Sequence, residues 1–115
     1  MTRQVTRGGN PSRITEAELQ QAVVTLGRLL GFKLIYHTHD SRHSAEGFPD
    51  LVMVSARHKR VLFVELKSEK GQLSEHQTIW FAELLAAEAE VYVWRPKDWQ
   101  NGTIEHILKG GHIDS

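Results

Sequence analysis

Three ionisable residues lie within apolar segments that have the composition of β-strands. Asp50 opens the run Asp-Leu-Val-Met-Val, and Glu65 and Lys67 close the run Val-Leu-Phe-Val-Glu-Leu-Lys. A charge in such a segment is costly to bury unless it is paired or bound to a metal ion. Residues two apart in a strand point to the same face, so we expect Glu65 and Lys67 to lie side by side while Leu66 faces the core.

This set of side chains suits the metal-dependent hydrolysis of a phosphodiester. Carboxylates of Asp50 and Glu65 on adjacent strands would be hard oxygen ligands of the kind that Mg²⁺ prefers. The metal would polarise the phosphate and acidify a bound water. Lys67 would stabilise the charge of the transition state or orient the attacking water. The alternative is an exposed Glu65–Lys67 ion pair of little energetic consequence, with Asp50 as a turn residue after Pro49.

The surrounding pattern predicts two helices that begin at capping boxes. Thr15 with Glu18, and Ser74 with Gln77, have the spacing at which two side chains bond reciprocally to the backbone of a helix start. Gly31 lies where a left-handed residue would end the first helix. In order, the predicted elements are a helix at about 15–30, strands at 32–38, 50–55 and 61–68, a helix at about 75–88 and a strand at 91–94.

These elements predict an α/β fold with a mixed sheet flanked by helices, in the order α-β-β-β-α-β. The short turn at 56–60 requires an antiparallel pair, whereas the helix between the third and fourth strands permits a parallel crossover. The basic residues from Arg57 to Arg60 are expected at a solvated hairpin tip. After Pro96, which stops the last strand, the pattern predicts a short closing helix or strand.

The composition limits the class of protein and the kind of site. At 115 residues we expect one domain at 15–109, between a flexible basic arm at 1–14 and a flexible tail at 110–115. Basic and acidic residues number 14 each, so attraction to nucleic acid must come from local patches. Without cysteine, disulfides and Cys-based zinc sites are excluded. There is neither an apolar run near the ~20 residues of a membrane span nor a signal-peptide core, so we expect a soluble intracellular protein.

The sequence resembles a known family of nucleases in three motifs that follow one another in order. These are Gly47-Phe48-Pro49-Asp50, Glu65-Leu66-Lys67 and Ser74-x-x-Gln77. They look like the successive motifs of the PD-(D/E)XK nuclease superfamily, and within it most like the stand-alone VRR-NUC (virus-type replication-repair nuclease) domains of phages and bacteria. The likeness covers roughly residues 15–99. Each motif alone is common, so the resemblance rests on their order, strand context and separation.

The resemblance implies a restriction-endonuclease-like core and a DNA endonuclease that depends on Mg²⁺ or Mn²⁺. By the same resemblance, Asp50 and Glu65 hold the metal with the backbone carbonyl of Leu66, and Lys67 is the catalytic lysine. Gln77 would join this catalytic set from the second helix. No organic cofactor is expected.

Family members also carry a glutamate on the first helix that completes the acidic cluster. Glu18 and Glu16 are both candidates for this catalytic and metal-binding role, and Glu18 is preferred because it stands directly before Leu19-Gln20. Glu18 and Gln77 are equally well explained as capping-box residues, and the two roles are compatible.

Histidines and basic residues near the motifs suggest contacts with DNA. His37, His39 and His43 also permit a zinc or histidine-base interpretation, which the lack of cysteine and the oxygen-rich acidic set disfavour. The residues expected to contact DNA phosphates are His37, Ser41, Arg42, His43 and Lys70.

The resemblance further implies a homodimer that cuts branched DNA at two symmetric sites, as Holliday-junction resolvases do. Such an enzyme would act in replication, repair or recombination in the cytoplasm of a bacterial cell or a phage-infected host. The alternatives are a flap or single-strand nuclease, a restriction-like nuclease of plain duplex, and a non-catalytic DNA-binding module of the same fold. Among the large aromatic residues, Trp80, Phe81, Trp94 and Trp99 are expected in the core or at a dimer interface.

Overall fold

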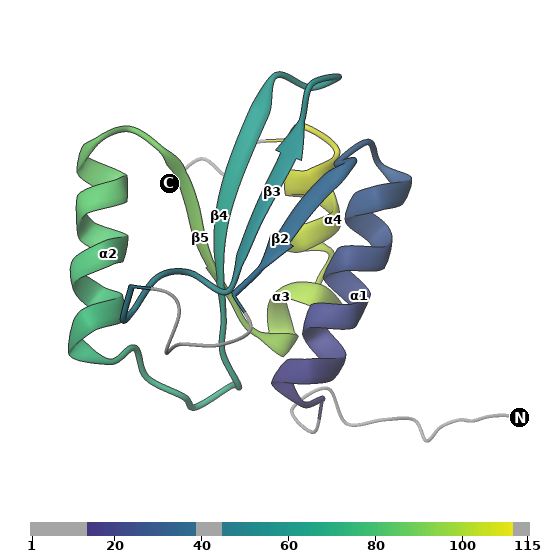
Figure 1. Cartoon of the computed structure of the whole chain (residues 1–115). Coiled ribbons are helices and arrows are strands. Elements are labelled where there is room, and N and C mark those ends of the chain that lie inside the picture. Colours follow the sequence, from purple (N-terminus) through teal and green to yellow (C-terminus); the bar gives the residue numbers. More distant parts are fainter. Residues whose placement is uncertain (1–13, 39–44, 112–115) are drawn as a thin grey trace, which may run out of the picture.

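The computed structural model describes residues 14–38 and 45–111, so most of the predicted arm and tail lies outside it. Figure 1 shows a sheet with helices on both sides. In chain order the elements are α1 (Glu16–Leu29), β2 (Leu34–His37), β3 (Leu51–Ser55), β4 (Arg60–Leu66), α2 (Glu75–Ala86), β5 (Glu90–Trp94), α3 (Pro96–Gln100) and α4 (Thr103–Leu108). Among these residues, no helix is both long enough and apolar enough to cross a membrane.

The sheet has the mixed topology that the turn and crossover lengths predict. Its strands lie in the order β2-β3-β4-β5. β2 with β3 and β3 with β4 are antiparallel, whereas β4 and β5 are parallel and are connected by α2. The expected α/β fold with a mixed sheet flanked by helices is therefore confirmed. The segment that the pattern left open forms two short helices, and Pro96 occupies the first turn of α3, where its missing N–H costs nothing.

The main core lies between the sheet and the helices α1 and α4, while α2 lies on the other side (Figure 1). The register of the central strands places Leu51 opposite Val64 and Met53 opposite Leu62, all four buried. Burial of each such side chain contributes about 1.5–3 kcal/mol. Further core residues come from the flanking elements: Leu19, Val23, Val24, Phe32, Leu66, Trp94, Ile104, Ile107 and Leu108.

The second helix is less buried than its apolar sequence suggests. None of its residues is fully buried, and Ile79 and Leu85 are exposed. Trp80 and Phe81, expected in the core or at an interface, are half-buried. Trp94 is in the core, as expected, and Trp99 packs against it.

The prediction of a solvated basic hairpin tip is wrong for two of its residues, His58 and Arg60. Arg60 begins β4, and its guanidinium pairs with the carboxylate of Glu90 and lies over the Phe32 ring. The His58 ring stacks on Phe32, and its Nε2 is 2.7 Å from the carbonyl oxygen of Leu30. Both side chains therefore connect the hairpin to neighbouring elements instead of facing solvent.

Candidate active site

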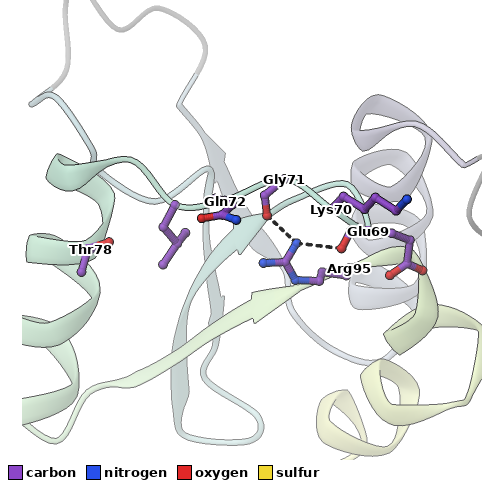
Figure 2. A pocket seen from close by; sticks show the side chains of 7 residues that line it. Glu69, Lys70, Gly71, Gln72, Thr78 and Arg95 are labelled. Atoms are coloured by element: carbon purple, nitrogen blue, oxygen red, sulfur yellow. Dashed lines mark hydrogen bonds between the residues drawn. The ribbon is translucent and has the colours of Figure 1, made fainter.

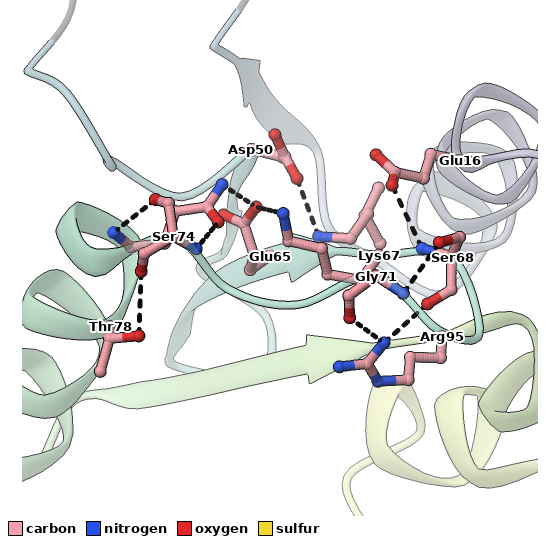
Figure 3. A network of polar contacts seen from close by, with 11 residues as sticks. Glu16, Asp50, Glu65, Lys67, Ser68, Gly71, Ser74, Thr78 and Arg95 are labelled. Carbon is pink, nitrogen blue, oxygen red and sulfur yellow. Dashed lines mark hydrogen bonds and ion pairs between the residues drawn. The ribbon is translucent and has the colours of Figure 1, made fainter.

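The start of β3 lies beside the end of β4, which brings Asp50 next to the segment that carries Glu65. In this antiparallel pair Leu51 lies opposite Val64. Asp50 directly precedes β3, and its Oδ2 accepts a hydrogen bond from the backbone N–H of Leu66 at 2.8 Å (Figure 3). The sheet register therefore places the two acidic residues together, at the end of the sheet where β3 begins and β4 ends.

Glu65 is a buried carboxyl group whose surroundings disfavour its charged form. It is 5% exposed. Burial, and then the neighbouring carboxylate of Asp50, raise the pKa of Glu65 to about 8, against the opposing charge of Lys67. Lys67 Nζ lies 4.0 Å from Glu65 Oε2, and Leu66 between them is buried. A carboxyl group in this position gains from any nearby cation, since positive charge lowers the cost of ionising it.

Gln77 combines the capping contact and the site contact in one side chain. Its Oε1 accepts a hydrogen bond from the backbone N–H of Ser74 at 2.8 Å, which completes the capping box of α2. Its Nε2 donates to Glu65 Oε2, also at 2.8 Å. The two interpretations of Gln77 are therefore not alternatives, because the amide supplies one acceptor and one donor at opposite ends.

The two glutamates of α1 have different partners in the structure. Glu18 Oε1 accepts from the backbone N–H of Thr15 at 3.0 Å, so its side chain is used in the capping box. Glu16 Oε2 accepts from the backbone N–H of Ser68 at 3.2 Å, and the charge of Glu16 adds to the raised pKa of Glu65. Residues two apart on a helix point about 200° apart, so only one of the pair faces the acidic cluster. That residue is Glu16.

The glycine of the first motif, Gly47, lets the loop approach the start of α2. Gly47 has φ +87°, a backbone conformation that favours glycine. A Cβ atom at this position would lie 2.4 Å from the backbone carbonyl carbon of His76. The close approach joins the loop that carries Asp50 to the helix that carries Gln77.

The two residues that follow also hold Asp50 in place. The Phe48 ring packs edge-on against Phe63 of the sheet and Trp80 of α2, with ring centres 6.4 and 5.1 Å apart. The carbonyl oxygen of Pro49 accepts from the Thr38 hydroxyl at 2.7 Å, and Thr38 N–H donates to the Asp50 carbonyl oxygen at 2.9 Å. The Gly-Phe-Pro part of the motif is thus explained by the positioning of the aspartate.

Only some of the residues expected to contact DNA are among those that the structure describes. Ser41, Arg42 and His43, together with His39 of the zinc interpretation, lie outside the described residues. His37 lies at the end of β2, where its Nδ1 is 3.1 Å from Nε2 of Gln20. Lys70 is exposed and lines an open pocket of about 610 Å³ between the loop after β4, α2 and the end of β5 (Figure 2).

Arg95 is a neighbour of the site that the sequence did not single out. Its Nη1 donates to three backbone carbonyl oxygens of the loop after Lys67, those of Ser68, Glu69 and Gly71. No side-chain pattern could have indicated this role, because the acceptors are main-chain atoms of a segment 24 to 27 residues away.

The acidic residues fit a divalent cation in a site completed by water. Within residues 14–38 and 45–111, no cluster of three or more His, Asp or Glu side chains is arranged to hold a metal ion. Mg²⁺ nevertheless needs only one or two protein carboxylates, since waters and substrate fill its other positions. Asp50 and Glu65 provide two carboxylates whose mutual repulsion a cation would relieve, and the adjacent Leu66 offers a backbone carbonyl.

Comparison with known proteins identifies a family and several relatives. Residues 4–98 match the VRR-NUC domain family. The chain is 38% identical over 56 residues to a Fanconi-associated nuclease 1 homolog of Schizosaccharomyces pombe, covering 49% of the chain and 8% of that protein. It is 43% identical over 54 residues to Fanconi-associated nuclease 1 of Homo sapiens, covering 47% and 5%. For the Danio rerio protein of that name the identity is 35% over 80 residues, covering 69% and 8%.

The matched segment is a small part of these relatives. The chain spans less than a tenth of the length of each of the three. No solved structure matches the chain significantly.

Proposed function

The chain belongs to the VRR-NUC domain family, and from this premise we propose that it is a divalent-metal-dependent DNA endonuclease. The observation that carries the proposal is the meeting of Asp50, Glu65 and Lys67 where β3 begins and β4 ends. A structural ion pair accounts for Glu65 and Lys67 alone. It does not account for a second carboxylate beside a buried one, an arrangement that costs free energy until a cation is present.

The proposed ligands are Asp50, Glu65 and the carbonyl oxygen of Leu66, with Glu16 as the acid from the first helix. The chemistry that bound Mg²⁺ or Mn²⁺ supplies is polarisation of the scissile phosphate and a lower pKa for a coordinated water. Glu65 must lose its proton to serve as a metal ligand, and its raised pKa opposes this loss in the absence of a cation. The hydrogen bond from Gln77 favours the ionised carboxylate and fixes its orientation.

Lys67 has the placement of a group that acts on the phosphate. Its Nζ is 4.0 Å from Glu65 Oε2, which is too long for a hydrogen bond and leaves its protons available to a substrate oxygen. A positive charge here stabilises the negative charge that develops on the phosphate oxygens during attack. The same amine can instead orient the attacking water, since both roles need the same position.

For the substrate we propose branched DNA, cut by a homodimer with two symmetric sites. Apolar side chains on the face of the sheet that is turned away from α1 support association with a second copy. Leu34, Tyr36 and Val61 are 70%, 58% and 44% exposed, and the register puts Leu34, Val54 and Val61 in one row across three strands. Exposed apolar surface of this kind is typical of interaction sites.

Cleavage of flaps, single strands or plain duplex is the alternative activity, and a DNA-binding module without turnover is the alternative outside enzymes. The proposed phosphate contacts are His37, Lys70 and the residues Ser41, Arg42 and His43, which lie outside the described part of the chain. We also propose a role in replication, repair or recombination in the cytoplasm of a bacterial or phage-infected cell. The three relatives bear the name of a Fanconi-associated nuclease, which supports a DNA substrate.

A cleavage panel tests the proposal. The substrates are a four-way junction, a flap, a splayed arm, a duplex and a single strand, each with Mg²⁺, with Mn²⁺ and with chelator. We expect metal-dependent cleavage that Lys67→Ala lowers by about 100-fold or more, whereas Lys97→Ala, at an exposed lysine of α3, keeps wild-type activity. A wild type that cuts no substrate, or a Lys67→Ala variant that cuts equally well, would refute the assignment. Sedimentation of the protein with and without the preferred substrate tests the homodimer.

A further inference from the structure

The segment between Lys67 and Ser74 connects Lys67 to the helix that carries Gln77, and both of these side chains lie beside Glu65. Lys67 begins this segment, and Ser74 caps the helix from which Gln77 reaches Glu65. The segment contains no helix or strand. Its conformation must therefore be held by other contacts, because a loop of this length has many conformations of similar free energy.

Arg95, directly after β5, supplies the main contacts of this kind. Its Nη1 donates to the carbonyl oxygens of Gly71 at 2.6 Å and of Glu69 at 3.3 Å (Figure 2). It also donates to the carbonyl oxygen of Ser68 at 2.6 Å (Figure 3). Hydrogen bonds from a charged donor are shorter and stronger than neutral ones. Three carbonyl oxygens that point to one place attract a positive charge. The Arg95 guanidinium supplies that charge, and its hydrogen bonds to all three hold the loop in this conformation.

The contacts extend to the acidic cluster through Ser68. Its carbonyl accepts from Arg95, its Oγ accepts from Gly71 N–H at 3.1 Å, and its N–H donates to Glu16 Oε2 at 3.2 Å. Beside it, the backbone N–H of Lys67 donates to the carbonyl oxygen of Trp94 at 3.0 Å. Figure 3 shows Glu16 and Asp50 on one side of this segment and Arg95 on the other.

We propose that Arg95 is a positioning residue that orders the segment 67–71, and through it Lys67, the Leu66 carbonyl and Glu16. The inference rests on the proposed function, since it assigns Arg95 a part in the same reaction. Arg95 does not touch the proposed reacting groups itself. The contacts favour this role over a direct phosphate contact because Nη1 is already shared by three carbonyl groups of the protein.

The test compares Arg95→Lys and Arg95→Gln with the matched control Lys97→Gln in the full chain. Lysine keeps the positive charge but lacks the planar fork of the guanidinium. We expect Arg95→Lys to lower kcat by about 10- to 100-fold, as a misplaced catalytic group does, with KM and DNA affinity within about twofold of wild type. Lys97→Gln should match the wild type in every measurement.

Two further readouts do not depend on cleavage. Amide hydrogen exchange should become faster in residues 67–71 while the central strands keep their protection, since the loop loses its anchor and the core does not. Mn²⁺ affinity by calorimetry should fall several-fold, because the Leu66 carbonyl and Glu16 lose their fixed positions. If Arg95→Lys fails to fold, Ser68→Ala removes one link of the same chain of contacts and should show the same changes, smaller in size.

The outcomes separate this inference from the proposed function. Unchanged kcat and unchanged exchange in Arg95→Lys would overturn the inference while wild-type cleavage still stands. Weaker DNA binding with a shallower salt dependence and unchanged exchange would also overturn it, by assigning Arg95 to a phosphate contact. A wild type that cuts no DNA would refute the proposed function, whereas the exchange and Mn²⁺ measurements would still decide whether Arg95 orders the segment.

Discussion

Gln77 Nε2 donates a hydrogen bond of 2.8 Å to Glu65 Oε2, and the same amide caps α2 through its Oε1. The capping box thereby determines more than where the helix begins. Because the amide oxygen is fixed by Ser74 N–H, the amide nitrogen is directed at the buried carboxyl group. One short-range signal in the sequence thus sets a contact between a helix and a strand.

Gln77→Glu should separate the two functions of this side chain. Glutamate at the same position still closes a capping box, so thermal stability should change little. Its carboxylate replaces the donor to Glu65 with a like charge, which raises the cost of ionising Glu65. We expect kcat at neutral pH to fall by about 10-fold or more, measured on the preferred substrate of the wild type.

Ser74→Ala is the matched control for that variant. It removes the side-chain cap of α2 and should cost about 1 kcal/mol of stability with little effect on kcat. An unchanged kcat in Gln77→Glu would show that helix capping alone explains the role of Gln77, because that variant keeps the cap.

The stability of the metal-free protein should fall as pH rises from about 4.5 to about 8. The folded protein holds Glu65 protonated up to a pKa of about 8, whereas the unfolded chain ionises it near its ordinary value of 4.5. Between these values the unfolded state binds fewer protons, so stability decreases with pH, at most by about 1.4 kcal/mol per pH unit for one group. Urea unfolding at several pH values between these limits, with chelator present, measures this change in the free energy of unfolding.

Glu65→Gln isolates the contribution of this one carboxyl group. The variant should have a flatter stability profile between these pH values, and Mg²⁺ should flatten the profile of the wild type by favouring the ionised form. If wild type and Glu65→Gln show parallel profiles, the pKa of Glu65 is not raised in the folded protein.

Glu16→Ala should affect metal binding, whereas Glu18→Ala should affect stability. Both residues are in the first turn of α1, so each change removes a similar favourable interaction with the helix dipole. Glu16→Ala should weaken Mn²⁺ binding several-fold, because it removes a carboxylate beside the cluster. Glu18→Ala should leave that affinity unchanged and lower stability by about 1 kcal/mol through loss of the capping contact. Calorimetry and thermal unfolding would show the reverse pattern if Glu18 were the helix-borne acid.

Gly47→Ala should destabilise the fold more than Gly102→Ala. Both glycines have positive φ, +87° and +83°, so both variants bear the cost of a left-handed alanine, about 1–2 kcal/mol. Only at Gly47 would the new Cβ collide with backbone, that of His76, whereas no atom lies within 4 Å at Gly102. We therefore expect a further loss of about 1–3 kcal/mol in Gly47→Ala. Equal melting temperatures for the two variants would contradict the tight contact between the loop and α2.

Sequence patterns predicted the order of the elements because those patterns are local. Alternation of apolar residues and the Thr15 and Ser74 capping boxes depend on neighbours within one turn or one strand. The choice between Glu16 and Glu18 was not local in this sense. Both precede the same apolar stripe, and only the packing of α1 beside Ser68 shows which carboxylate faces the cluster.

The hairpin turn shows the same limit. Four consecutive basic residues predict a solvated tip, yet Arg60 meets Glu90, thirty residues later, across the parallel pair of β4 and β5. The Tyr92 hydroxyl also donates to Glu90, and burial and this hydrogen bond raise the pKa of Tyr92 to about 12. A charged residue can leave the solvent when a distant partner of opposite charge is brought to it.

By itself the sequence determined the mixed α/β fold and the acidic and basic residues suited to phosphodiester chemistry, because strand alternation, helix capping and motif order are written in short stretches of chain. The tertiary structure alone decided which carboxylates share one environment, that Gln77 serves both α2 and Glu65, and that Arg95 holds the loop beside Lys67. These contacts join residues far apart along the chain, and their geometry follows from sheet register and helix packing, which no single stretch specifies.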